Sequence, residues 1–132
     1  MEAHSDELVY VEAPALELLG KLGWETVSAY SETFGPDGTL GRDSQSDVVL
    51  VHRLREALTE LNPNVPVAGI DVAVDELVRT DTKDKVRANK RIHLLLRDGF
   101  PVQVENSDGI SETVRVRFVD WDNPNGNKFL AV

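Results

Sequence analysis

The last twenty residues, Thr113 to Val132, constrain the fold most, because they read as a strand, a polar turn and a second strand. From Val114 to Phe118 apolar residues alternate with arginines, which is the period-two pattern of a half-buried strand. Asp120 to Asn127 then concentrates residue types that reverse a chain, and its Asn125-Gly126 pair is expected to supply positive φ angles. A second apolar run follows at Phe129 to Val132, which predicts a further strand.

This second apolar run has no turn, cap or charged tail after it. A natural C-terminal edge strand is one interpretation of that pattern. We favour the other, in which the chain is a piece of a longer protein and its sheet continues beyond Val132. Exposed strand edges recruit other chains. We therefore expect the piece to self-associate, through that edge or through an uncovered apolar face formed by Val114, Val116 and Phe118.

Length and composition limit the class of protein. A chain of 132 residues is typical of one domain, so we predict a single domain over residues 1–132. The absence of cysteine excludes a disulfide framework and a thiolate zinc site. Because the chain has neither a signal-peptide pattern nor an apolar run long enough for a bilayer, we expect a cytoplasmic protein without membrane contact. The net charge of −9 disfavours general adhesion to DNA phosphates but permits a local basic patch.

Apolar periodicity predicts four helices and a hairpin. The first predicted helix covers Val11 to Leu22, with Gly23 as its cap, and the third covers Ile70 to Val78. The second begins at a capping box formed by Ser44 to Asp47 and ends at Asn62-Pro63. The fourth begins at Asn89, which acts as its cap, and ends at Asp98-Gly99. The predicted strands are Trp24 to Val27 and a hairpin of Phe100 to Val104 with Thr113 to Val119. The glycine-rich segment Tyr30 to Asp43 is typical of a mobile loop. These elements predict an α/β (mixed α+β) fold class, with helices packed on a partial mixed sheet.

Basic residues gather between the third and fourth helices, in the segment Thr80 to Arg91. They are Lys83, Lys85, Arg87, Lys90 and Arg91, accompanied by Asp81 and Asp84. A solvated connection between helices is the plainer interpretation, and a contact with nucleic acid or a partner protein is the other. No aromatic residue interleaves with these bases, so stacking on single-stranded nucleic acid is not expected here.

The chain shows no complete set of catalytic residues. It has neither a phosphate-binding Gly-x-x-x-x-Gly-Lys loop nor a Gly-x-Ser-x-Gly elbow. His4, His52 and His93 are far apart, which favours surface positions over metal ligation. Asp120 and Asp122 follow a strand, where carboxylates often bind a divalent ion, but a tight turn uses the same side chains as hydrogen-bond acceptors and we favour that role.

Six stretches, taken in chain order, together carry a recognisable pattern. They are Val11-Glu12-Ala13-Pro14, Leu22-Gly23-Trp24, Gly41 to Leu50, Leu58 to Pro63, Leu94 to Gly99, and Val114 to Val132 with its Asp-Trp-Asp-Asn-Pro turn. This pattern resembles the N-terminal region of the endonuclease (R) subunit of type I restriction–modification enzymes. The resemblance covers nearly the whole chain and is weakest over Tyr30 to Leu40 and Thr80 to Val86.

The resemblance implies a large cytoplasmic subunit that assembles with methylation (M) and specificity (S) subunits, uses ATP to translocate double-stranded DNA, and cleaves it. It also implies a nuclease domain of the PD-(D/E)xK class, in which carboxylates hold Mg²⁺ that activates water. The Arg-Pro-Asp and Glu-x-Lys segments of that class are absent from this chain and are expected downstream of Val132. We therefore expect this piece to bind no cofactor and to be inactive alone, while its parent uses Mg²⁺ and ATP.

Nucleases of this class often carry a glutamate on the helix that precedes the sheet. Glu12 matches that position, with Glu17 as a second choice. A carboxylate in the first turn of a helix also has an ordinary role as a partner of the helix dipole. An alternative function for the whole piece is a docking module that contacts the M and S subunits, with the basic residues between Thr80 and Arg91 as its contact.

Overall fold

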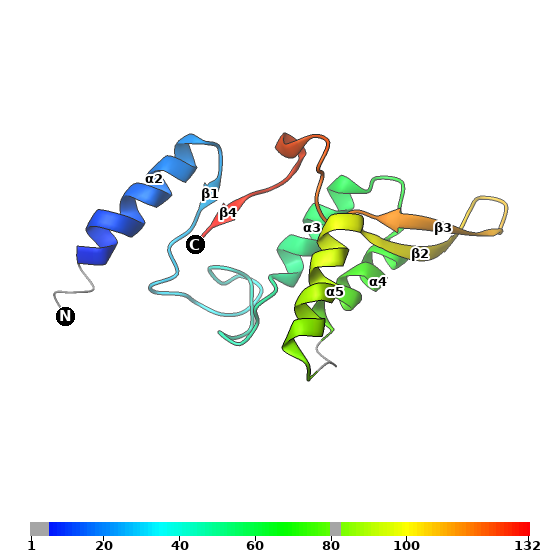
Figure 1. Ribbon diagram of the computed structural model, residues 1–132, viewed down its shortest axis with the longest axis horizontal. Helices are drawn as coiled ribbons and strands as arrows, with labels where there is room; N and C mark the ends of the chain where they lie inside the picture. Colours follow the sequence, from blue (N-terminus) through cyan, green and yellow to red (C-terminus); the bar gives the residue numbers. More distant parts are fainter. Residues whose placement is uncertain (1–5, 80–82) are drawn as a thin grey trace. The chain divides into compact units, whose positions relative to one another are not determined.

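The computed structural model describes residues 6–79 and 83–132 and divides them into two compact units (Figure 1). The first unit contains the residues up to Ser44 together with Lys128–Val132, and the second unit contains Gln45–Asn127. None of the described helices is long and apolar enough to cross a membrane. The mixed α/β class predicted from the sequence is confirmed, and each unit is described in turn.

The first unit joins a helix to a short parallel strand pair. A π-helical segment η1 (Leu8–Glu12) leads into α2 (Ala13–Lys21), so the predicted first helix is confirmed and starts earlier than expected. Gly23, at φ 94°, turns the chain into β1 (Glu25–Thr26), as expected of a residue without a side chain. Strand β1 pairs in parallel with β4 (Leu130–Ala131). Beside this pair the rings of Trp24 and Phe129 stack with centroids 4.8 Å apart.

The glycine-rich segment after β1 closes on itself. The amide of Gly35 donates to the carbonyl of Arg42 at 2.8 Å. The guanidinium of Arg42 donates two hydrogen bonds to the Glu32 carboxylate, at 2.7 and 2.6 Å, and these bonds lower the pKa of Glu32 below its ordinary value. Leu40, within this segment, is buried. Side-chain bonds therefore give this segment a defined path despite its glycines.

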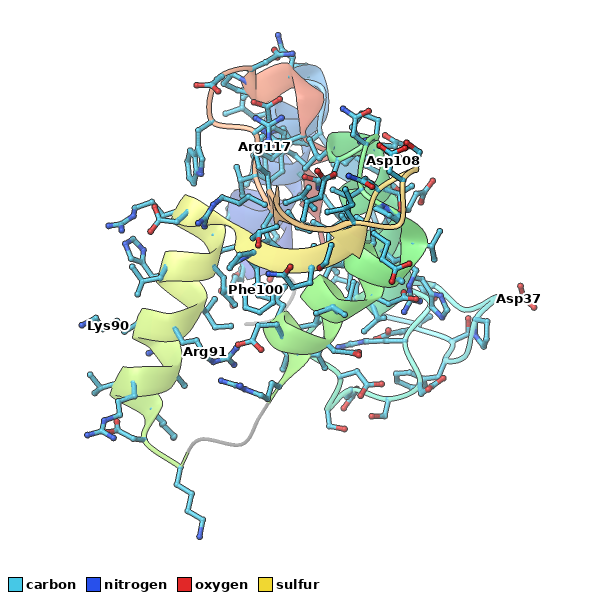
Figure 2. The ribbon with its side chains drawn as sticks, turned by 90° about the vertical axis from the view of Figure 1, so that its right-hand side faces the viewer. Asp37, Lys90, Arg91, Phe100, Asp108 and Arg117 are labelled. Atoms are coloured by element: carbon cyan, nitrogen blue, oxygen red, sulfur yellow. The ribbon has the colours of Figure 1, made fainter. Side chains whose placement is uncertain are left out.

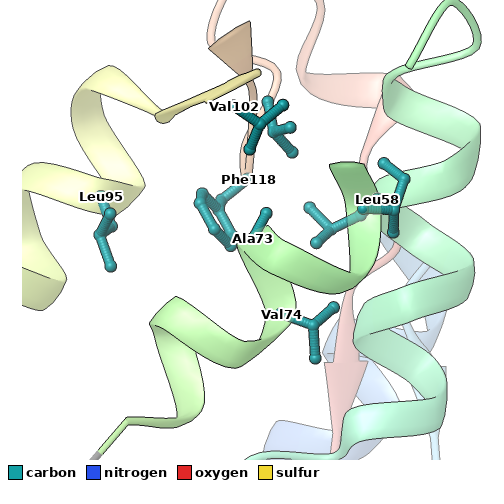
Figure 3. Packing of buried hydrophobic residues seen from close by; sticks show 8 residues of the cluster. Leu58, Ala73, Val74, Leu95, Val102 and Phe118 are labelled. Atoms are coloured by element: carbon teal, nitrogen blue, oxygen red, sulfur yellow. The ribbon is translucent and has the colours of Figure 1, made fainter. Parts of the chain in front are cut away.

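The second unit packs three helices and a hairpin around one apolar core. The elements are α3 (Val51–Leu61), α4 (Val67–Val78), α5 (Lys85–Asp98), β2 (Phe100–Glu105) and β3 (Ser111–Val116), the two strands pairing antiparallel. The core, shown in Figure 3, consists of Leu58, Ile70, Ala73, Val74, Leu95, Val102, Val116 and Phe118. The predicted uncovered apolar face is therefore wrong, because Val116 and Phe118 are buried and Val114 packs against the same cluster.

Two predicted helix starts are wrong. The Ser44–Asp47 segment does not cap α3, whose N-cap is Leu50, because the apolar stripe that meets the core begins only at Val51. Asn89 does not cap α5 either. The Asp84 carboxylate accepts from the amides of Val86 and Arg87 at 3.0 and 3.3 Å and starts the helix five residues earlier than predicted. Most of the predicted charged connection is consequently helical.

The strands form two small sheets in the described residues, one parallel (β1 with β4) and one antiparallel (β2 with β3). The partial mixed sheet expected from the sequence is thus divided, and β4 pairs with β1 instead of β3. The expected positive φ at Asn125-Gly126 is also wrong, because these residues belong to a short 3₁₀ segment η2 (Pro124–Gly126). Self-association through a strand edge stays a prediction.

Candidate functional site

Glu12 lies where η1 passes into α2, within the first unit. The backbone on both sides is helical from at least Asp6, so Glu12 is beyond the first turn of this helical run. Since the effect of the helix dipole falls off within the first turn, a simple dipole role explains Glu12 poorly. Its carboxylate Oε2 instead accepts a 2.5 Å hydrogen bond from the phenol of Tyr30, a contact between residues eighteen positions apart.

Glu12 and Tyr30 line a groove in the first unit, and this groove has a volume of about 840 Å³. Its other lining residues are mostly apolar and come from the helical run, from the segment after β1 and from β4: Leu8, Ala13, Ala15, Leu16, Leu19, Val27, Ser28, Ala29, Ala131 and Val132. Glu17, the second candidate, does not line this groove. It faces solvent and pairs with Lys21 at 3.0 Å, which leaves Glu12 as the carboxylate of the groove.

The hydrogen bond between Tyr30 and Glu12 can be tested without measuring catalysis. The bond to Glu12 is the main cause that raises the pKa of the Tyr30 phenol above 10.0, followed by burial and by the charges of Glu12 and Glu7. In a Tyr10→Phe background, Tyr30 is the remaining tyrosine. We expect Glu12→Gln to lower the midpoint of its ultraviolet titration, because the charge that opposes phenolate formation is removed. An unchanged midpoint, with Glu17→Gln as the control, would contradict the contact.

The described residues do not assemble a metal centre. No group of three or more His, Cys, Asp or Glu side chains among them is arranged to hold a metal ion. His52 and His93 are exposed, as predicted, and His4 lies outside the described residues. Glu12 is therefore a single carboxylate without a second ligand in this part of the chain.

Asp120 has the turn role favoured from the sequence. Its Oδ1 accepts from the amides of Asp122 and Asn123 at 3.2 and 3.0 Å. Asn127 completes the turn by accepting from the Asp120 amide at 2.8 Å and donating to the Asp120 carbonyl at 3.0 Å. Asp122 is exposed. The Asp-Trp-Asp-Asn-Pro turn is thus held by its own side chains.

The basic residues identified from the sequence separate into two groups. Lys83, Lys85, Arg87 and Lys90, which we call the α5 basic cluster, are exposed before and along the first half of α5. Arg91 instead points toward α4, whereas Lys90 points away from it (Figure 2). The Arg91 guanidinium donates to the backbone carbonyls of Glu76 and Arg79, the latter at 2.6 Å. Arg91 thereby satisfies carbonyls at the end of α4, while Thr80 and Asp81 lie outside the described residues.

Comparison with known proteins gives the chain its family. The family model described as Type I restriction enzyme R protein N terminus matches residues 5–132. The chain belongs to this family. The Type I restriction enzyme HindI endonuclease subunit of Haemophilus influenzae is similar to it, with 35% identity across 92% of this chain. The chain spans 11% of that subunit's length. No solved structure matches the chain.

Membership in the R protein family confirms the resemblance seen in the sequence. The matched residues include both Glu12 and the α5 basic cluster. Tyr30, which contacts Glu12, was not identified from the sequence, because it lies in a loop without periodicity and within the stretch that resembles the family least. A hydrogen bond to a residue in another element leaves no signal in a single sequence.

Proposed function

We propose that this chain is the N-terminal part of an endonuclease subunit that translocates and cleaves unmodified double-stranded DNA with ATP and Mg²⁺. The observation that carries this proposal is the match across residues 5–132 together with 35% identity to an endonuclease subunit. The parent protein would act in the cytoplasm and assemble with methylation and specificity subunits.

We further propose that residues 1–132 form the start of a nuclease domain of the PD-(D/E)xK class. Magnesium requires several oxygen ligands, usually including one or two carboxylates. Glu12 can supply one of them from the wall of the groove, where the bond from Tyr30 fixes its orientation. The Arg-Pro-Asp and Glu-x-Lys segments are absent from the chain, so the remaining ligands would come from the rest of the parent protein. Residues 1–132 alone would then be inactive.

The role of Glu12 can be tested in the full-length subunit assembled with its M and S partners. We expect Glu12→Gln to slow DNA cleavage by at least about tenfold, because an amide oxygen is a weaker ligand for a divalent ion than a carboxylate. ATP hydrolysis should be unchanged, since the groove contains no phosphate-binding loop. The measurement is plasmid cleavage and phosphate release from the same reaction.

Glu17→Gln is the matched control, since Glu17 lies on the same helix but outside the groove. Cleavage by Glu12→Gln at the wild-type rate would exclude Glu12 from catalysis, and equal losses in both variants would indicate a structural effect. The 132-residue chain, incubated with plasmid, Mg²⁺ and ATP, should neither cleave DNA nor hydrolyse ATP. Metal-dependent nicking by this chain that requires Glu12 or Asp120 would contradict its proposed inactivity.

The docking function is the second candidate, because the α5 basic cluster is exposed and, among the described residues, its ion pair is that of Arg87 with Asp84 at 3.5 Å. A docking surface would bind the M or S subunits, whereas a DNA-binding surface would bind a duplex. The binding experiment described below separates the two.

A further inference from the structure

We propose that the α5 basic cluster binds the backbone phosphates of double-stranded DNA. The inference rests on the proposed function, because an endonuclease subunit must hold a duplex. It concerns the second unit alone and does not involve Glu12 or the groove. The partner is identified by its chemistry, which is a regular array of backbone phosphates that can be contacted without reading the base edges in the grooves.

Positive charge is concentrated on α5 in a chain of net charge −9. The helix contains five basic residues and one acidic residue, Asp98. Two of the five are already engaged, since Arg91 bonds to carbonyls of α4 and Arg97 donates to Asp98 at 2.8 and 2.6 Å. Within the described residues Lys85 and Lys90 form no ion pair, and the Arg87 side chain is 85% exposed with Asp84 3.5 Å away. The charges left over therefore face solvent on the first half of α5.

The stability of α5 does not explain this arrangement. Cations near the positive N-terminal end of a helix are unfavourable, and among the described residues the Asp84 carboxylate at the N-cap is the one acid at this end, since the first turn of α5 contains none. Arg87 also has like-charged neighbours three and four residues later, at Lys90 and Arg91, and such pairs destabilise a helix by a few tenths of a kcal/mol each. Arg87 has the Asp84 carboxylate at 3.5 Å, but Lys85 and Lys90 have no such partner among the described residues, whereas Lys21 and Arg55 elsewhere in the chain both pair with carboxylates. An external anion would remove the repulsion within the cluster.

The side chains of the cluster suit phosphates of a duplex better than bases of a single strand. Lysine ammonium groups are mobile point charges that contact phosphate without reading sequence. No aromatic residue lies between Lys83 and Lys90 to stack on an unpaired base. Arg87 and Lys90, three residues apart, lie on the same face of α5 and roughly 5 Å apart along its axis, whereas Lys85 lies on a different face. Arg87 and Lys90 can therefore contact neighbouring phosphates together.

The test measures binding of the 132-residue chain to a short labelled DNA duplex by fluorescence anisotropy over a series of salt concentrations. The variant combines Lys85→Ala, Arg87→Ala and Lys90→Ala, changes that favour the helix. We expect binding at low salt to weaken at least about tenfold, and the slope of log affinity against log salt to fall by roughly two to three. Single-stranded DNA of equal length should bind more weakly than the duplex.

The matched control combines Lys21→Ala, Arg55→Ala and Lys128→Ala, which removes the same total charge elsewhere. It should retain most of the binding, and an equal loss in both triple variants would overturn the proposal in favour of a general charge effect. Absence of duplex binding by the wild-type chain would overturn it, as would cluster-dependent binding to the M or S subunits without binding to DNA. None of these results bears on the Glu12 cleavage test, so failure here leaves the proposed function open to its own test.

Discussion

Replacing Asn62 with alanine is expected to lower the free energy of unfolding of the second unit by about 3 kcal/mol. Asn62 is buried at the end of α3, with 7% of its surface exposed. Its Nδ2 donates to the carbonyls of Leu58 and Arg117 at 2.8 and 2.9 Å, and its Oδ1 accepts from the Arg117 amide at 2.8 Å. Alanine would leave both backbone groups of Arg117 without this partner, and unpaired buried polar groups are costly.

Chemical denaturation of wild-type and variant protein measures this effect. Asn64→Ala is the matched control, since Asn64 is an exposed asparagine two residues later, and it should change stability by less than about 0.5 kcal/mol. Asn62→Asp should cost about as much as alanine at neutral pH, because a carboxylate can accept from the Arg117 amide but cannot donate to the two carbonyls. A loss below about 1 kcal/mol in Asn62→Ala would show that water replaces the lost bonds.

Replacing Gly99 with alanine is expected to cost about 4 kcal/mol or more. Gly99 ends α5 at φ 74° and ψ −171°, a region of backbone conformation that is essentially restricted to glycine. A Cβ atom there would lie 2.4 Å from the carbonyl oxygen of Val116, a backbone atom of β3. The hairpin and the end of α5 would have to separate to admit the methyl group, which disrupts packing around Leu95 and Val116 in the core.

Gly109→Ala separates the two causes of this loss. Gly109 lies in the hairpin turn at φ 75°, nearly the same value, but a Cβ atom there meets nothing within 4 Å. It should therefore cost only about 1–2 kcal/mol, the usual penalty for a left-handed residue with a side chain. The thermal unfolding midpoint should fall much further for Gly99→Ala than for Gly109→Ala. Equal decreases would mean that the β3 backbone moves aside at little cost.

The helices and the hairpin were predictable because their signals are local. Apolar periodicity located α3, α4 and α5, and the Asn62-Pro63 and Asp98-Gly99 pairs marked where helices end. The starts of α3 and α5 were predicted at the wrong residues, since several residues near each start can act as caps. In the structure the N-cap of α5 is Asp84 and not Asn89, because the Asp84 carboxylate accepts from the amides of Val86 and Arg87.

The pairing of distant segments could not be predicted. The side chain of Asn62 has its partner 55 residues away at Arg117, and the separation between Glu12 and Tyr30 is eighteen residues. Neither partner stands out in composition or periodicity. The same reason explains β4, whose apolar residues predicted a strand correctly while its partner, β1, lies at the other end of the chain.

The candidate site was predictable in part. Glu12 was identified through the family resemblance, and the structure adds its groove and its bond to Tyr30. The basic residues of α5 were visible as a charged segment. Which of them face solvent could not be predicted, because Arg91 is engaged by the backbone carbonyls of Glu76 and Arg79, and a contact with another helix leaves no signal in the local sequence.

The pairing of Glu25 with Leu130 and of Thr26 with Ala131 sets an order of events during synthesis on the ribosome. Strand β1 emerges early, but its partner is made only after the whole of the second unit. The helices and hairpin of the second unit follow one another in the chain and can assemble as soon as they emerge, because domains generally fold as units during translation. The second unit is thus an insertion that matures before the first unit is closed. The nascent chain must keep β1 unpaired until Leu130 and Ala131 have emerged, and the two-residue length of β1 limits its pairing with other chains in that interval.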